Sequence, residues 1–360
     1  MRNWFLCVCL LPALASAQQD SLDIKIGQMI IMGLDDFNKL ERNQPMFDEI
    51  RQGLLGNVII YGKHINKKNP QEELKDITRH IQKIAPIPVI IGIDEEGGKV
   101  NRLKPEFGFP KTRSAHYLGK VDKEDSTRFY ARAVGRNLTD LGINMNFAPN
   151  VDLNLNPANP IIGMKERSFS GDMKRVTKHA AWVLDEQRKA GVINVLKHFP
   201  GHGSSASDTH LGMADVTDAW KIQELYPYKE LIAQDKVRAV MTAHIVNERL
   251  DSTRVPATLS REIITGLLRD FLGFTGVIIS DDMLMHAISR HFGFEEALVR
   301  SINAGVDMVM IANNTELTER YTATQINALI KANVQNGTIP EARIDESYKR
   351  IMWLKASLKN

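Results

Sequence analysis

Imidazole and carboxylate groups are concentrated in one segment of the sequence. The segment reads Lys-His-Phe-Pro-Gly-His-Gly over residues 197–203 and continues to Asp208 and His210. Side chains of these types can transfer protons, and they are also ordinary zinc ligands. The zinc interpretation is disfavoured, because a Pro-Gly pair breaks any helix between His198 and His202 and no Glu follows His198. We therefore expect acid–base chemistry in this segment and no metal.

Further polar clusters stand directly after short apolar runs. They are the acidic, glycine-containing segment 94–98, the long segment 150–169, residues 242–244, residues 280–283 with two adjacent aspartates, and residues 313–314. If the apolar runs are parallel strands, all these clusters lie at the carboxyl ends of the strands. The sequence thus predicts one edge on which ionisable side chains converge. His244 belongs to this edge without an assigned role.

Eight apolar, β-branched runs predict strands over residues 27–32, 57–61, 89–93, 143–147, 192–196, 237–241, 277–280 and 308–311. Amphipathic stretches predict helices over residues 71–84, 126–141, 173–190, 261–271 and 294–304, with a final helix over 344–358. Eight such units favour an α/β fold, a single (β/α)8 TIM-type barrel with an extra C-terminal helix. An open doubly wound sheet is disfavoured, because no glycine-rich phosphate loop follows the first strand. We found no repeat or long linker, and we expect residues 18–360 to form one domain.

These clusters resemble glycoside hydrolase family 3, and within it the single-domain β-N-acetylglucosaminidases. The resemblance is carried by Asp-Glu-Glu-Gly-Gly-Lys-Val-Asn-Arg at 94–102, Asn-Pro-Ile-Ile-Gly at 159–163, Arg-Ser-Phe at 167–169, the 197–210 segment and Ser-Asp-Asp-Met at 280–283. It extends over about residues 22–315 in the family's order. The sequence departs from the family pattern at Glu95, where Gln is common, at Lys99, where Arg is frequent, and at the pair Lys165-Glu166, which looks inserted.

Retaining glycoside hydrolysis needs a carboxylate nucleophile on one side of the anomeric carbon and a proton donor on the other. The resemblance implies that Asp281, at the end of an apolar strand, is the nucleophile. Asp282 is the alternative. The other common role of an aspartate at the end of a strand is to cap the following helix, and this role fits Asp282 better than Asp281.

The resemblance implies that His210 is the acid/base and that Asp208 orients it. Residues two apart in an extended segment point the same way, so the carboxylate can accept from one ring nitrogen while the other faces the glycosidic oxygen. Many family members take their acid/base from a second domain. Because the sequence ends at Asn360, we expect the donor to come from the barrel itself.

The resemblance assigns sugar binding to Asp94, Arg102, Arg167, Lys197 and His198. Charge-assisted hydrogen bonds suit the recognition of hydroxyl groups, and a buried Asp or Arg without a partner would be costly. For Arg102, a structural salt bridge with a neighbouring acid such as Glu96 is an equal alternative. His202 is expected to hold its loop through hydrogen bonds.

Residues 1–17 have the pattern of a cleaved signal peptide, with a basic start, an apolar run over 5–14 and Ala-Ser-Ala at the end. The run is far shorter than the about 20 residues that span a bilayer, so we expect no stable membrane insertion. Cys7 and Cys9 lie in this segment, which leaves the expected mature chain without cysteine. We expect an exported protein, periplasmic or secreted.

The charge is nearly balanced, since 46 basic and 43 acidic residues among 360 give a formal net charge of +3. Without a basic stripe, nucleic acid is not an expected partner. The combined prediction is an exported retaining exo-β-N-acetylglucosaminidase that acts on peptidoglycan fragments or related glycans, without a cofactor and with a monomer favoured. The alternatives are a β-glucosidase of the same family, a β-N-acetylglucosaminide phosphorylase, since a His acid/base does not repel phosphate, and an inactive exported glycan-binding barrel.

Overall fold

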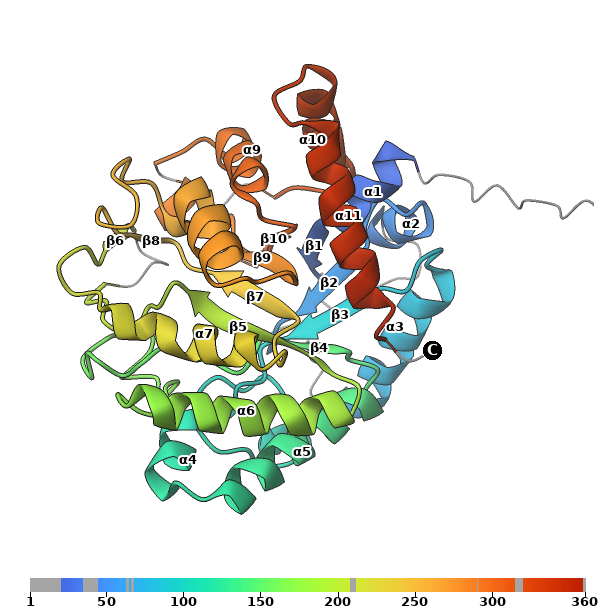
Figure 1. Ribbon diagram of the computed structural model, residues 1–360. Coiled ribbons are helices and arrows are strands. Elements are labelled where there is room, and N and C mark those ends of the chain that lie inside the picture. The colour runs from blue at the N-terminus through green and yellow to red at the C-terminus, as the bar shows by residue number, and fades with distance from the viewer. Residues whose placement is uncertain are drawn as a thin grey trace, which may run out of the picture.

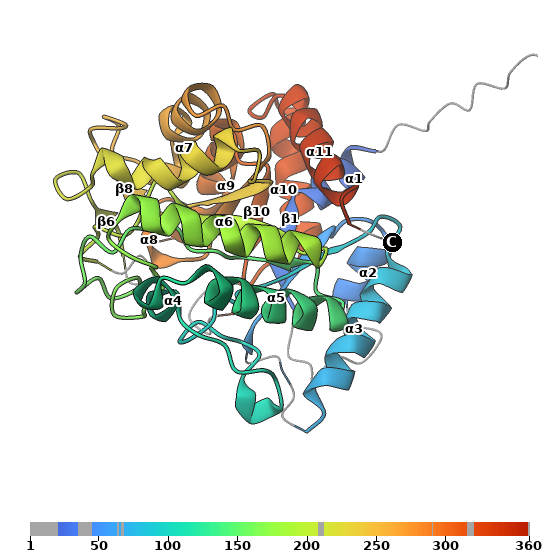
Figure 2. The same cartoon turned by 60° about the horizontal axis from the view of Figure 1, so that its bottom comes forward.

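A ring of eight parallel strands forms the centre of the molecule (Figures 1 and 2). The computed structural model describes residues 21–34, 45–62, 65, 68–207, 212–289, 291–314 and 320–358. The strands are β1 (Ile30–Gly33), β2 (Asn57–Ile60), β3 (Ile90–Ile93), β4 (Met145–Asn146), β5 (Ile193–Phe199), β7 (Ala239–Thr242), β9 (Val277–Asp282) and β10 (Met308–Ile311). They close in the order β1-β10-β9-β7-β5-β4-β3-β2. A separate two-stranded sheet pairs β6 (Ala214–Asp215) with β8 (Ile245–Val246).

Helices surround this ring, as Figure 1 shows for α6, α7 and α11. The α-helices are α1 (Leu22–Gln28), α2 (Pro45–Arg51), α3 (Pro70–Ile84), α4 (Ala115–Val121), α5 (Glu124–Asp140), α6 (Met173–Lys189), α7 (Tyr226–Ala233), α8 (His286–Ser289), α9 (Phe294–Ala304), α10 (Ala323–Gln335) and α11 (Glu341–Lys355). Short 3-10 turns are η3 (Pro105–Phe107), η4 (Ile222–Leu225) and η5 (Ala257–Leu259), and η6 (Glu262–Phe271) is a π-helix. Among the described residues, no helix is both long enough and apolar enough to cross a membrane.

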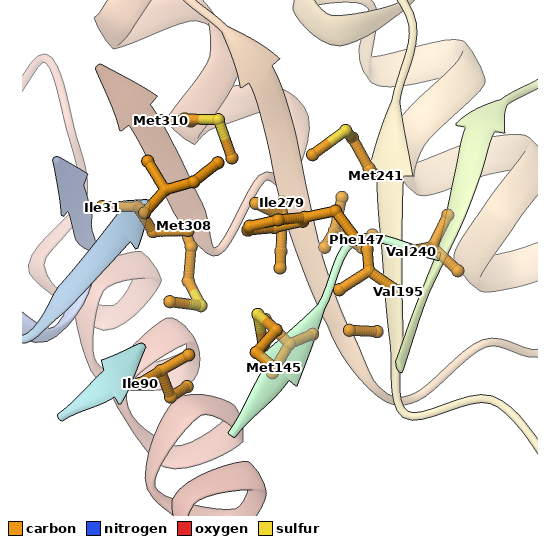
Figure 3. Packing of buried hydrophobic residues seen from close by; sticks show 14 of the residues in the cluster. Ile31, Ile90, Met145, Phe147, Val195, Val240, Met241, Ile279, Met308 and Met310 are labelled. Atoms are coloured by element: carbon orange, nitrogen blue, oxygen red, sulfur yellow. The ribbon is translucent and has the colours of Figure 1, made fainter. Parts of the chain in front are cut away.

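The interior of the barrel is filled by apolar side chains from the strands and the loops that leave them. Figure 3 shows Phe147, Ile279 and Met308 among the side chains that fill the space between the strands, and each is buried. A Cβ at Gly92 on β3 would lie 2.6 Å from Cε2 of Phe147, so the glycine makes room for this ring. Because helices cover the outside and side chains fill the inside, both faces of each strand are buried, which explains the continuous apolar runs in the sequence.

The predicted α/β barrel is confirmed, and the predicted strands match the observed ones within a few residues. The first strand is the exception, because Leu22–Gln28 forms α1, whose N-terminus is capped by the Ser21 hydroxyl, and β1 begins only at Ile30. Helices α1, α2, α4, α7, α8 and α10 were not among the helices named from the sequence. Five of these are eight residues long or shorter. Helices of that length form through tertiary packing more than through their own sequence.

Candidate active site

A cavity of about 950 Å³ opens at the carboxyl ends of the barrel strands. Its lining includes every predicted site residue that lies in the described part of the chain: Asp94, Arg102, Arg167, Lys197, His198 and Asp281. The predicted acid/base pair, Asp208 and His210, lies outside the described residues. The barrel therefore brings side chains from the ends of β3, β4, β5 and β9 together at one site.

Asp94 directly follows β3 and pairs with two cations. Its Oδ1 lies 2.6 Å from Nζ of Lys197, which projects from β5, and its Oδ2 lies 3.4 Å from Nη2 of Arg102. Burial alone would raise the pKa of Asp94, but the charges of Lys197 and Arg102 outweigh it and hold the pKa below its usual value. The carboxylate is therefore ionised at neutral pH and can accept hydrogen bonds from a ligand.

Glu96, which was not predicted as a site residue, links two of the predicted ones. Its carboxylate accepts from Nε and Nη2 of Arg167 at 2.9 and 2.7 Å, and its Oε1 lies 2.8 Å from Nζ of Lys197. Burial would raise the pKa of Glu96, but Arg167 and Lys197 lower it to about 2. The alternative for Arg102, a structural salt bridge with a neighbouring acid, is present, but the acid is Asp94 and not Glu96, which pairs with Arg167 and Lys197.

The imidazole ring of His198 lies between the carboxylate of Asp152 and the guanidinium of Arg167. Its Nδ1 is 2.8 Å from Oδ2 of Asp152, and its Nε2 is 3.2 Å from Nη2 of Arg167. A guanidinium can only donate, so Nε2 accepts and Nδ1 carries the proton that is donated to Asp152. Burial would raise the pKa of Asp152, but its contacts with His198 and His202 lower it to about 2. Asp152 was missed by the sequence analysis, although it lies in the polar segment that follows β4.

The adjacent aspartates at the end of β9 have different surroundings. Oδ1 of Asp281 accepts from the backbone N–H of Asp282 at 2.8 Å, and the side chain lines the cavity. Oδ1 of Asp282 accepts from the backbone N–H groups of Leu284 at 3.1 Å and Ala312 at 3.0 Å. The Asp282 carboxylate thus ties the turn after β9 to the end of β10, and neither of these two bonds reaches a residue of the following helix α8 (His286–Ser289). Both aspartates line the cavity, but the Asp282 carboxylate is held by the backbone N–H groups of Leu284 and Ala312.

Two further residues shape the site and were not predicted. Glu95 is 2% exposed, and its Oε2 accepts from the backbone N–H groups of Arg102 at 2.8 Å and Leu103 at 3.1 Å. Burial raises the pKa of Glu95 to about 8. Tyr61 follows β2 and lines the cavity. Burial, followed by the charges of the nearby aspartates, raises the Tyr61 pKa well above its usual value, so its hydroxyl keeps its proton.

The loop after β5 is held largely through its backbone. The N–H of His202 donates to Oδ1 of Asp152 at 2.8 Å, and the carbonyl of His202 accepts from Nδ2 of Asn159 at 2.8 Å. Burial lowers the pKa of His202 to about 4, so the ring is neutral at physiological pH. These two backbone hydrogen bonds of His202 hold the loop after β5 in place. Within the described ranges, no three His, Cys, Asp or Glu side chains are grouped closely enough to hold a metal ion.

Comparison with known proteins places the chain in a family. The model of the "Glycosyl hydrolase family 3 N terminal domain" matches residues 21–354. "Beta-hexosaminidase A" of Pseudoalteromonas piscicida is 34% identical over 330 residues, which are 84% of this chain and 54% of that protein. "Beta-hexosaminidase LpqI" of Mycobacterium tuberculosis is 35% identical over 278 residues, which are 75% of this chain and 69% of that protein.

Solved structures of glycoside hydrolase family 3 proteins are also similar to this chain. A glycoside hydrolase family 3 β-N-acetylglucosaminidase from Paenibacillus sp. FPU-7 superposes with a TM-score of 0.85 at 33% identity and covers 94% of this chain. The chain spans 62% of that protein's length. A β-N-acetylhexosaminidase from Beutenbergia cavernae superposes with a TM-score of 0.79 at 28% identity, over 93% of this chain and 98% of the other. The match of the family model to nearly the whole described chain, on a barrel of the expected topology, shows that this chain belongs to glycosyl hydrolase family 3.

Proposed function

We propose that this chain is an exported, retaining exo-β-N-acetylglucosaminidase. The observation that carries the proposal is the convergence of Asp281 and the Asp94–Lys197–Arg102 cluster on one cavity of a family 3 barrel. Relatives that carry the names β-hexosaminidase and β-N-acetylglucosaminidase support the choice of sugar. The predicted leader over residues 1–17 supports export.

The proposed reaction has two steps. The Asp281 carboxylate attacks the anomeric carbon while His210, oriented by Asp208, gives its proton to the glycosidic oxygen, and the aglycone leaves as an alcohol. Water then attacks the glycosyl ester on Asp281, and His210 accepts a proton from it. N-Acetylglucosamine is released with its β configuration retained, and Asp281 and His210 return to their starting states.

The cluster beneath the cavity supplies the contacts for the sugar. The ionised Asp94 accepts from a sugar hydroxyl, while Lys197 and Arg102 donate to neighbouring oxygens. Arg167 is held at the cavity wall by Glu96 and contributes a further donor. Because these charges already pair with each other, the sugar meets an array that needs little rearrangement on binding.

The substrates that fit the proposal are glycans with a terminal β-linked N-acetylglucosamine. We propose peptidoglycan fragments as the main class, because an exported enzyme with this sugar preference meets such fragments outside the cytoplasm. A cavity of about 950 Å³ has room for a second sugar or other aglycone beside the N-acetylglucosamine. No cofactor takes part in either step.

The experiment compares release of nitrophenol from 4-nitrophenyl β-N-acetylglucosaminide and 4-nitrophenyl β-glucoside by the chain from residue 18 onward. We expect preference for the N-acetyl sugar. Asp281→Asn is expected to lower kcat by about a thousandfold or more, because the amide is a very poor nucleophile. Asp76→Asn is the matched control, since Asp76 is an exposed aspartate on α3 outside the cavity lining.

Four results would change the assignment. Preference for the glucoside would make the chain a β-glucosidase. Sugar 1-phosphate formed in the presence of phosphate would make it a phosphorylase. Full activity of Asp281→Asn would remove the proposed nucleophile, and inactivity of the unmodified chain on natural muropeptides as well as on both nitrophenyl glycosides would favour a glycan-binding barrel.

A further inference from the structure

The end of β9 carries Asp281. The pairing of β9 with β10 reaches Asp282, but the pairing with β7 stops short of Asp281. Between β7 and β9 the pairs run from Ala239–Val277 to Met241–Ile279. The ladder on the β7 side therefore ends two residues before Asp281. Something other than strand pairing must fix the position of the last residues of β9 on this side.

The side chain of His244 spans this gap. His244 lies between β7 and β8, is 1% exposed, and its Nε2 is 3.0 Å from the backbone carbonyl oxygen of Asp282. A carbonyl can only accept, so Nε2 carries a proton and donates it. On the other side of the ring, Nδ1 lies 2.9 Å from Oγ1 of Thr258. That hydroxyl is in turn within 2.7 Å of Oγ1 of Thr242, the last residue of β7.

Asp282 is consequently fixed at three points. Its carbonyl accepts from His244, its carboxylate accepts from Leu284 and Ala312, and its N–H donates to Oδ1 of Asp281. The last of these bonds sets the orientation of the Asp281 carboxylate. A shift of Asp282 would therefore be passed directly to the carboxylate of Asp281.

We propose that His244 is a positioning residue for the nucleophile, acting through the carbonyl of Asp282. This inference rests on the proposed function, in which Asp281 attacks the sugar. His244 joins β7 to the end of β9 and so holds Asp281 at the distance and angle needed for attack. Because a misplacement of about 1 Å can lower a reaction rate about a hundredfold, a single hydrogen bond at this point is sufficient to matter.

The test uses two substitutions that each keep one half of the His244 contacts. His244→Gln can present an N–H at the place of Nε2 and so keep the bond to Asp282, while it loses the contact with Thr258. His244→Asn can keep the contact with Thr258 but is too short to reach the Asp282 carbonyl. A merely structural role predicts similar losses for both variants, whereas a positioning role predicts a large difference.

The readout is the pre-steady-state burst of dinitrophenol from 2,4-dinitrophenyl β-N-acetylglucosaminide, which reports formation of the glycosyl-enzyme. We expect the rate constant to fall at least about tenfold in His244→Asn and to stay within about threefold in His244→Gln. The inhibition constant of N-acetylglucosamine should be unchanged in both, because Asp94 and Lys197 are untouched. Thr258→Val removes the outer hydroxyl only and should resemble His244→Gln.

Equal burst rates in the Gln and Asn variants would overturn the inference, as would a parallel change in the inhibition constant. If the Asn variant does not fold, His244→Met replaces it, because Met has the length of Gln without an N–H donor. Asp281→Asn separates the two proposals. Activity in that variant would contradict the role of Asp281 as nucleophile. An inactive Asp281→Asn together with a fully active His244→Asn would contradict only the role of His244.

Discussion

At the scale of single residues, the groups at and behind the cavity wall form one continuous chain of ion pairs and hydrogen bonds. It runs from Asp94 through Lys197, Glu96, Arg167 and His198 to Asp152, each linked to the next at 3.2 Å or less. Each cationic group in this chain contacts a carboxylate, so the free-energy cost of removing these charges from water is offset by their ion pairs. The residues expected to touch sugar are therefore held by Glu96 and Asp152, which stand behind them.

The first prediction concerns Glu96. Glu96→Gln removes the charge that Lys197 and Arg167 share and replaces one acceptor by a donor that points at a cation. Breaking a buried pair by removing one partner costs about 3–5 kcal/mol. We expect N-acetylglucosamine to bind at least about tenfold more weakly, which corresponds to about 1.4 kcal/mol, and kcat/KM to fall by more. The measurement is the inhibition constant of N-acetylglucosamine.

Glu166→Gln is the matched control for this prediction. Glu166 pairs with Lys99 at 2.7 Å, and both side chains are well exposed. Exposed pairs contribute about 0–1 kcal/mol, so the control should bind N-acetylglucosamine within about threefold of the unmodified chain. Equal losses in the two variants would show that Glu96 does not organise the sugar site.

At the scale of elements, the loop that leaves β3 is closed by one carboxyl group. Oε2 of Glu95 accepts from the backbone of Arg102 and Leu103, and both backbone groups of Glu95 bond the side-chain amide of Asn146 on β4. The loop over residues 94–103 thus leaves the barrel, and the hydrogen bonds of Glu95 bring its far end back to the barrel. This return places the Arg102 side chain over Asp94, which directly precedes Glu95.

The second prediction is a pH dependence of stability that arises from this closure. Burial raises the pKa of Glu95 from 4.5 to about 8. Between these values the folded chain holds a proton that the unfolded chain releases, so this group makes stability fall as the pH rises from about 4.5 to 8. Glu95→Gln keeps an acceptor for the two N–H groups and has no such titration.

Urea denaturation of both proteins at pH 5, 6.5 and 8 measures the effect. We expect the free energy of unfolding of the unmodified chain to decline relative to that of Glu95→Gln across this range. The difference should level off above pH 8, where both the folded and the unfolded chain are ionised at this position. A difference that is constant with pH would contradict the assignment of the titration to Glu95.

At the scale of the whole molecule, the barrel could be predicted because its signals are local. Eight apolar runs bounded by polar clusters define the strands and the edge that carries the site. Side-chain partners are different, because they join residues far apart in sequence. Lys197 and Asp94 are separated by 103 positions and His198 and Asp152 by 46, so no spacing rule could pair them. For Asp208 and His210 the sequence remains the whole basis of the prediction.

The third prediction concerns the packing that links the barrel interior to the site. Gly92→Ala would place a methyl group 2.6 Å from Cε2 and 3.1 Å from Cζ of Phe147. Phe147 is fully buried, so its ring can move only by displacing other core side chains. We expect a loss of about 1–3 kcal/mol in the free energy of unfolding. Gly266→Ala is the control, since the nearest atom to its Cβ is 3.7 Å away in the flexible Glu262 side chain.

The smaller side chain in Phe147→Leu should relieve this clash. The loss in the double variant Gly92→Ala/Phe147→Leu is then expected to be smaller than the sum of the two single losses, with a coupling of at least about 0.5 kcal/mol. Because Phe147 lies at the end of β4, five residues before Asp152, the same displacement should also lower kcat/KM in Gly92→Ala. Strictly additive losses in urea denaturation would mean that Gly92 does not make room for Phe147, and unchanged kcat/KM would mean that the core packing is not transmitted to the cavity.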